Sequence, residues 1–583
     1  MPLIAFLIAV AGPLLLNEAV LPNTSHPNQI FAVFGWGLVL FAAPAQRAGV
    51  DVLRALRPLL LALALVCVGC VLSMATGGVP TSPGWAMLAM QLMAAALALH
   101  GASIACVRPE AVFRAFAIAL VVAGVLGALI GILQIFTHVE LGNPVIAALV
   151  DAGRAVGNLG QPNQFADTQV WALAALVPLL PSVSAQDLRA RMLRVGLLAI
   201  GVLLLFGVIL SASRTGMVGI AMLAAWGIFD RSLPRQTRIA LVASVAVAAL
   251  LWWGMSLWAQ GDVKAADLGH RPGDFSTVRF LLWKHSMMLI AQQPLLGVGW
   301  GQYAFATALT PMSDRVPRFD DHAHNLPLQL AVELGVPMAL AIVALLVAAL
   351  WLAIRNVRRL PGHAGIAGRS VVLMILYMGV HSMVEYPLWY TYFLFPTAWL
   401  WGLALGWSVT PVTVQATSVA ADAQPRQFAS MPPDRAWRVG GALMAVSGAV
   451  AWLSYLTIVD AYQPNYRGPT PMAERIGRAE ASPLFRNYAD RMVALQAESP
   501  AEVLPYIQRA VRANPNGAVM FAWINGLELS GKDDEARYVA ARLREFKLTG
   551  PAPFYAPCDD PAVTEKPFQC LPPKRAMTWR DFK

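Results

Sequence analysis

The stretch VFRAFAIALVVAGVLGALIGILQIF, residues 112–136, contains a single charged side chain, Arg114, close to its beginning. A helix needs about 20 consecutive apolar residues to span the hydrocarbon core of a membrane. Because no water is available there, only a helix satisfies the backbone polar groups of such a segment. Similar runs recur along the chain, which is 57% hydrophobic and 13% charged over its 583 residues. The sequence therefore predicts an all-α protein that crosses a membrane many times.

The apolar runs of spanning length define the predicted membrane bundle. We expect about 13 spanning helices, within a range of about 12–14. The predicted spans are residues 3–21, 29–45, 58–76, 84–106, 112–136, 165–183, 195–211, 214–230, 238–258, 336–354, 370–386, 390–408 and 438–458. The first run has no basic segment before it and no clear cleavage site, so we interpret it as a retained span.

Arginines between the spans are distributed unevenly. Short loops on one side contain most of them, whereas the opposite short loops contain only Arg154 and Arg214. Cytoplasmic loops are enriched in Arg and Lys, so the arginine-rich side is predicted to face the cytoplasm. With an odd number of spans, the N-terminus is then cytoplasmic and the C-terminus lies outside. The net charge of +10 is mainly this topology signal, and no nucleic-acid partner is expected.

This pattern divides the chain into four regions. They are an N-terminal transmembrane bundle (1–258), a large outer loop between the ninth and tenth spans (259–335), C-terminal transmembrane helices (336–458) and an outer helical domain (459–583). In the last region, the spacing of Pro483 and Pro515 approaches the period of about 34 residues found in tetratricopeptide repeats, and helix pairs are expected. Cys558 and Cys570 could form a disulfide there in an oxidising compartment.

The segment DDHAHNLPLQ concentrates polar side chains in the outer loop. Its histidines, His322 and His324, lack the i and i+4 spacing of helical zinc ligands, so no metal site is expected. Asp320, Asp321 and His322 have no assigned role. A polar loop with solvated histidines is the alternative to a functional site.

A helix is predicted to begin directly after His324. Asn325 can cap this helix, and a polar stripe continues through Gln329 and Glu333. His324 would then lie just before the outer end of a helix that enters the membrane. At that position a histidine base could contact both a lipid-linked substrate in the membrane and a second substrate in the aqueous compartment.

Amide and guanidinium groups gather in two further outer loops. In RAVGNLGQPNQFAD, the side chains of Arg154, Gln161 and Gln164 could contact a polar ligand; a turn followed by a helix start is the alternative. In SASRTG, Arg214 has no acid nearby. Its guanidinium could bind a phosphate group bidentately, or simply extend to lipid headgroups.

Charged residues also lie on predicted helices near the membrane. Arg279 belongs to a segment rich in Leu, Trp and Met, which we expect to form a helix on the membrane surface. In HSMVEYPLWYTYF, His381 and Glu385 are spaced to share one helix face. These two side chains could satisfy each other within the bundle or contribute to a site. Tyr386 belongs to an expected interfacial aromatic belt.

Several of these motifs together resemble a known family. The segment DHAHNLPLQLAVELGVP resembles the signature of the bacterial O-antigen ligase superfamily. RAVGNLGQPNQFAD, SASRTG, PLLGVGWGQY and HSMVEYPLWYTYF are similar to the protein O-oligosaccharyltransferases of this superfamily, the PglL-type ligases that glycosylate pilins. The resemblance implies a polytopic helical bundle in the bacterial inner membrane, with a large periplasmic loop and a periplasmic active site.

The resemblance also implies a reaction. A glycan is transferred en bloc from undecaprenyl pyrophosphate to a Ser or Thr hydroxyl of a periplasmic protein such as pilin, with inversion and without a metal or other cofactor. His324 corresponds to the catalytic histidine, and Arg214 to the arginine that meets the pyrophosphate. Further correspondences are one of Gln161 and Gln164, together with Arg279 and Tyr386.

The sequence is compatible with other functions. A lipopolysaccharide O-antigen ligase or an O-antigen polymerase would use a different acceptor, and the outer helical tail favours a protein acceptor. A secondary transporter also has many helices with internal charges, but its coupling groups lie near the membrane midplane in repeated halves. The polar motifs here cluster at one face, which favours the transferase. A scaffold that docks partners through its tail is a further alternative.

Overall fold

The computed structural model describes residues 2–18, 20–43, 45, 49–106, 109–137, 139, 143–149, 153–180, 188–260, 274–407, 435–463 and 468–582. Every regular element in these ranges is a helix. The prediction of an all-α fold is therefore confirmed for the described part of the chain.

Each predicted apolar span corresponds to a helix or a short series of helices. These elements are α1 Pro2–Phe6 with η1 Leu7–Ala11 and α2 Gly12–Leu15, α3 His26–Ala42, α4 Val50–Ala75, α5 Thr81–Ala105, α6 Pro109–Phe136, α7 Pro162–Leu176, α8 Leu188–Leu210, α9 Arg214–Phe229, α10 Arg235–Gln260, α14 Val336–Val357, α15 Gly362–His381, α16 Thr391–Gly406 and α17 Arg435–Tyr462. Among the described residues, eight helices are long and apolar enough to cross a membrane, namely α4, α5, α6, α8, α10, α14, α15 and α17. The remaining predicted spans are shorter helices, so the count of thirteen stays a prediction.

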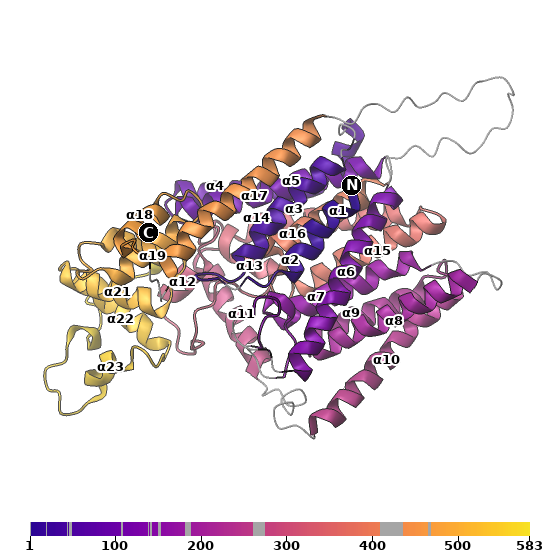
Figure 1. The fold of residues 1–583 in the computed structure, drawn as a ribbon. Coiled ribbons are helices and arrows are strands. Elements are labelled where there is room, and N and C mark those ends of the chain that lie inside the picture. The colour runs from indigo at the N-terminus through magenta and orange to yellow at the C-terminus, as the bar shows by residue number, and fades with distance from the viewer. Residues whose placement is uncertain are drawn as a thin grey trace.

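Shorter helices form the predicted outer loop and the C-terminal tail. They are α11 Asp274–Gln292, α12 Tyr303–Leu309, α13 Leu326–Leu334, α18 Met472–Glu480, α19 Arg486–Gln496, α20 Leu504–Ala513, α21 Gly517–Leu529, α22 Asp533–Glu545 and α23 Ala552–Asp559. The C-terminal helices, orange to yellow in Figure 1, lie together at one end of the bundle beside α12. α19 packs on α20 and α21 packs on α22, which confirms the predicted helix pairs; a tetratricopeptide fold stays a prediction. Cys558 and Cys570 form a disulfide in this region.

Contacts between loops bring the arginine-rich ends of several helices together. The Arg369 guanidinium lies 2.6 Å from the Asp230 carboxylate, which follows α9. The His363 ring, at the start of α15, lies 2.8 Å from the Pro178 carbonyl oxygen and 3.3 Å from the Glu110 carboxylate at the start of α6. These loops therefore lie at one end of the bundle, as their charge predicts, whereas the compartment that they face stays a prediction.

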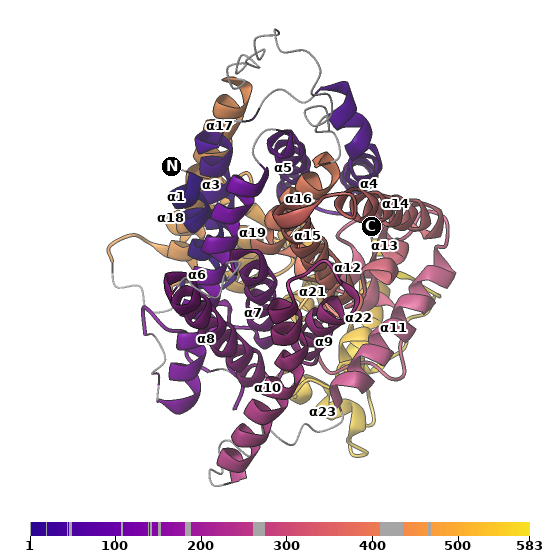
Figure 2. The same ribbon diagram turned by 90° about the vertical axis from the view of Figure 1, so that its right-hand side faces the viewer.

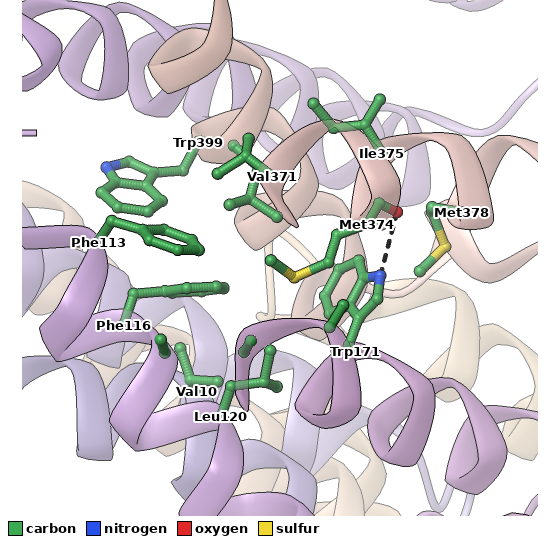
Figure 3. Packing of buried hydrophobic residues seen from close by; sticks show 14 of the residues in the cluster. Val10, Phe113, Phe116, Leu120, Trp171, Val371, Met374, Ile375, Met378 and Trp399 are labelled. Carbon is green, nitrogen blue, oxygen red and sulfur yellow. Dashed lines mark hydrogen bonds between the residues drawn. The ribbon is translucent and has the colours of Figure 1, made fainter. Parts of the chain in front are cut away.

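The bundle interior is filled by large aromatic and aliphatic side chains. Phe116 and Trp399 join α6 to α16, with ring centroids 5.3 Å apart (Figure 3). Trp171 on α7 packs against α15, and its indole N–H donates to the Met374 carbonyl oxygen at 3.1 Å. In Figure 2, α8, α9 and α10 form a group beside α7. α7 and α15 are thus fixed side by side, and both lead to the opposite, polar end of the bundle.

Candidate active site

His324 lies in a turn that is fixed at both ends. Its φ is 52°, in the left-handed region that few residues other than glycine adopt. Directly after it, the Asn325 side chain caps α13 by accepting from the Leu328 N–H at 3.0 Å, as predicted. The Asn325 amide also donates to the Met383 carbonyl oxygen at 3.0 Å. The turn is therefore attached to the chain that leaves α15.

The predicted polar stripe on α13 supports this turn from behind. The Gln329 side-chain oxygen accepts from the Ala323 N–H at 2.7 Å, and the Glu333 carboxylate accepts from the Tyr303 N–H at 3.2 Å. Both side chains are buried, and burial raises the pKa of Glu333 to about 7. These contacts are structural, and they hold His324 in a backbone conformation that costs about 1–3 kcal/mol.

The Glu385 carboxylate joins three polar side chains from distant parts of the chain. One oxygen lies 2.9 Å from His324 Nδ1. The other accepts from Arg279 at 2.6 Å and from the Asn163 amide at 3.0 Å. Burial alone would raise the pKa of Glu385, but the hydrogen bond from His324 and the charges of His324 and Arg279 outweigh burial and lower this pKa to about 2. Glu385 is therefore an anion at neutral pH.

This anion determines which nitrogen of His324 is available. With Nδ1–H donating to Glu385, the lone pair of the imidazole lies on Nε2. A carboxylate that orients a histidine in this way also stabilises the imidazolium formed when Nε2 takes a proton. The His324 side chain is 15% exposed, so it is held by the protein and still reachable. The pair has the geometry of an oriented general base.

A hydrogen-bonded chain leads from Glu385 to Ser213, the residue before Arg214. The Asn163 side-chain oxygen accepts from the Ser213 hydroxyl at 2.8 Å, and the Ser213 hydroxyl caps α9. Arg214 is the first residue of α9; its side chain is exposed and has no hydrogen bond or ion pair within the described part of the chain. Arg154 instead donates to the Ser211 carbonyl oxygen at 3.0 Å and so holds the turn before α9. Arg214 is the better placed of these two cations to meet an anionic ligand.

Both candidate glutamines lie at the start of α7. The Gln161 side chain caps the helix by accepting from the Gln164 N–H at 2.6 Å. The Gln164 side-chain oxygen accepts from the Tyr392 hydroxyl at 2.8 Å. Both glutamines line a cavity of about 340 Å³ that also contacts Asp321 and His322. The helix-start interpretation of this motif is therefore correct, and the same residues face a space that a ligand can enter.

Tyr386 lies between the two histidines. Its ring stacks on His322, with centroids 4.1 Å apart and planes 12° apart, and meets His324 edge-on at 4.8 Å. His322 Nδ1 lies 2.8 Å from the Asp321 carboxylate. Each histidine thus has its own acidic partner: Asp321 for His322 and Glu385 for His324.

The predicted pairing of His381 with Glu385 is wrong. α15 ends at His381, so Glu385 lies beyond the helix and does not share its face. The His381 ring instead lies 2.7 Å from the buried Asp167 carboxylate, which also accepts from the Tyr377 hydroxyl at 2.8 Å. The sequence does not identify Asp167 as the partner of His381, because Asp167 is only the last residue of the motif RAVGNLGQPNQFAD. The spacing of the sequence contains no signal for its partner.

Two family models match parts of the chain that contain several of these residues. A family model described as O-antigen ligase matches residues 199–343, and a model described as virulence factor membrane-bound polymerase, C-terminal, matches residues 370–547. The first range contains Arg214, Arg279 and His324, and the second contains Glu385. The contact between His324 and Glu385 therefore joins the two matched ranges.

Two curated relatives come from Acinetobacter baylyi (strain ATCC 33305 / BD413 / ADP1). A general O-oligosaccharyltransferase is 26% identical over 275 residues, which cover 43% of this chain and 43% of the relative. A ComP-specific O-oligosaccharyltransferase is 23% identical over 259 residues, which cover 43% of this chain and 44% of the relative. The matched region thus spans less than half of each relative.

The pKa of Glu385 predicts how stability changes with pH. Because this pKa falls from 4.5 to about 2 on folding, the ionised carboxylate stabilises the fold at neutral pH. This contribution should shrink as the pH falls from about 4.5 towards about 2, where the unfolded and then the folded carboxyl take up a proton. Glu385→Gln should therefore unfold at a lower temperature than the wild-type protein at about pH 7, and the difference should narrow between about pH 5 and about pH 3. Thermal unfolding of both proteins in detergent checks this, and a difference that stays constant over that range would contradict it.

Proposed function

We propose that this chain, a member of the O-antigen ligase superfamily that is similar to bacterial O-oligosaccharyltransferases, is itself an O-linked oligosaccharyltransferase. Its substrates would be a glycan carried on undecaprenyl pyrophosphate and a Ser or Thr hydroxyl of a periplasmic protein such as a pilin. The observation that carries this proposal is the His324–Glu385 pair, which Arg279 contacts and which Asn163 connects to Ser213, the residue before Arg214.

The proposed base is Nε2 of His324. A Ser or Thr hydroxyl is a poor nucleophile at neutral pH, and a base near its operating pH assists it most. Nε2 takes the hydroxyl proton while the hydroxyl oxygen bonds to the anomeric carbon of the first sugar. The bond from that carbon to the pyrophosphate oxygen breaks, and the pyrophosphate leaves with the electron pair. Attack opposite the leaving group inverts the anomeric carbon.

Arg214 and Arg279 are the proposed ligands of the pyrophosphate. Cations stabilise the charge that develops on a leaving phosphate, and guanidinium groups do so with directed hydrogen bonds. Arg279 already contacts Glu385, so it would bridge this anion and the substrate. Arg214 is exposed and therefore has more of its hydrogen-bonding capacity available. No step of this mechanism requires a metal ion.

The proposed location is the periplasmic face of the bacterial inner membrane. The site lies at the end of the bundle opposite the arginine-rich loops, and such loops face the cytoplasm. The isoprenoid chain of the donor can then stay in the bilayer while its pyrophosphate reaches the site. The proposed regions are residues 1–258, 259–335, 336–458 and 459–583, as the sequence predicts.

A protein acceptor is favoured by the helices after α17. α18 to α23 lie at the same end of the bundle as α12 and α13, where an acceptor would arrive. One of the similar relatives is named for a specific protein, ComP. The second candidate is an O-antigen ligase or polymerase, which the descriptions of the two matching family models favour. Intact mass of acceptor proteins, after co-expression with a lipid-linked glycan pathway, distinguishes the two.

His324→Ala tests the proposed base. Loss of a general base typically lowers the rate by about 10²–10⁴-fold, so glycan transfer should fall at least about 100-fold. Transfer is measured by intact mass of the acceptor, and membrane insertion by the amount of protein in purified membranes. His363→Ala is the matched control. His363 lies at the arginine-rich end of α15, away from the site, so this variant should keep full transfer. Full transfer by His324→Ala would contradict the assignment.

Arg214→Gln tests the proposed pyrophosphate contact. Removing one hydrogen bond between charged groups should lower kcat/KM for the lipid-linked donor about 10- to 100-fold, with the KM for the acceptor unchanged. Steady-state transfer with each substrate varied in turn measures both constants. Arg235→Gln is the control. Arg235, like Arg214, is the exposed first residue of a helix, but it lies at the arginine-rich end of the bundle. Equal losses in the two variants would remove the support for Arg214.

A further inference from the structure

The cavity beside His322 is distinct from the cation side of the site. It has a volume of about 340 Å³, at the lower end of the range of about 300–1,000 Å³ typical of small-ligand pockets. Its walls come from the Asn23–Ser25 segment, the start of α7, the Asp321–His322 turn and the chain from Tyr386 to Tyr392. Tyr386 lines this cavity and also meets the His324 ring edge-on, so the cavity lies on the Tyr386 side of His324.

The polar groups of the cavity suit hydroxyls better than phosphates. Among the described residues, those that line it include an acid, Asp321, and no Arg or Lys. The surrounding protein alone would raise the pKa of Asp321, but the charge and the hydrogen bond of His322 dominate and hold this pKa at about 2. The carboxylate side chain is 61% exposed and faces the cavity. An anion there repels a pyrophosphate and accepts hydrogen bonds from hydroxyl groups.

The aromatic walls suit the apolar face of a sugar ring. Tyr390 stacks between Tyr386 and Tyr392, with centroids 5.9 Å and 5.3 Å apart, and the Trp389 ring meets His322 edge-on at 4.9 Å. Flat rings with one polar edge bury an apolar surface and still hydrogen-bond at the rim. A pyranose presents the same combination, with hydroxyls at its rim and C–H groups on its face.

The far wall is fixed by helices from the C-terminal part of the chain. The Asn23 N–H donates to the Tyr455 hydroxyl on α17 at 3.2 Å, and the Tyr455 hydroxyl donates to the Asn23 carbonyl oxygen at 2.9 Å. The Asn23 amide also lies 3.4 Å from the Tyr488 hydroxyl on α19. The wall is therefore held in place without a ligand, as in most small-molecule sites.

Building on the proposed function, we propose that this cavity binds the first sugar of the lipid-linked donor, the sugar joined to the pyrophosphate. Asp321 and Gln161 receive its hydroxyls, and the aromatic side chains of Tyr386, Trp389 and Tyr390 line the space around it. The pyrophosphate then lies on the other side of His324, toward Arg279 and Arg214. His322 is a positioning residue, because its ring donates to Asp321 and fixes the direction of that carboxylate.

The test is direct binding by the full-length protein in lipid nanodiscs. The probes are undecaprenyl pyrophosphate carrying one N-acetylglucosamine or one N-acetylgalactosamine, and sugar-free undecaprenyl pyrophosphate. The wild-type protein should bind at least one sugar-bearing probe about tenfold more tightly than the sugar-free lipid, as a hydrogen bond to a charged group allows. Asp321→Asn, which keeps the side-chain shape, should lose this preference and bind the sugar-free lipid with unchanged affinity.

Asp320→Asn is the matched control. The neighbouring Asp320 pairs with Arg318 at 2.9 Å and does not line the cavity, so this variant should keep the preference. Three outcomes overturn the subsite: a wild-type protein that binds all these lipids equally, an unchanged preference in Asp321→Asn, or an equal loss of affinity for both kinds of lipid. Binding requires no acceptor, so a wild-type protein that prefers the sugar-bearing lipid but transfers nothing would contradict the proposed function and leave the subsite standing.

Discussion

The carboxylate of Glu385 is the interaction on which the site depends. It connects the turn before α13, helix α11 and the start of α7, and it is almost fully enclosed. Removing two charges from water is costly, so a buried ion pair persists only where further hydrogen bonds satisfy it. Glu385 meets this condition with His324, Arg279 and Asn163. The same contacts that satisfy the anion therefore bring the proposed base next to the proposed cations.

The helical architecture could be predicted from the sequence, because the membrane leaves few alternatives. Each apolar run, such as 112–136, is helical in the structure, since a lipid environment requires internal hydrogen bonding. The cap at Asn325 and the turn formers before α7 were also predictable from local chemistry. Local sequence does not determine how many of the shorter helices cross the membrane fully.

The site could be predicted only in part. His324, Arg279 and Glu385 were all candidates, but their mutual contact joins residues 61 or more positions apart, and spacing carries no information about it. The assumption that α15 continues past His381 led to the wrong pairing with Glu385. The side chains of Gln329 and Glu333 hydrogen-bond the backbone around the turn, and a contact of theirs with a ligand stays a prediction. Pattern analysis identifies chemistry, whereas the pairing depends on the packing of distant helices.

The two sides of His324 differ in charge, and this difference would orient a bound donor. Cations lie toward α9 and α11, and the cavity that Asp321 and Tyr386 line lies on the other side. A cryo-electron microscopy structure of the protein with a sugar-bearing undecaprenyl pyrophosphate tests this arrangement most directly. We expect the pyrophosphate to lie against Arg214 and Arg279, the sugar beside Asp321, and the anomeric carbon to face Nε2 of His324. A pyrophosphate in the cavity, or a donor bound out of reach of His324, would contradict it.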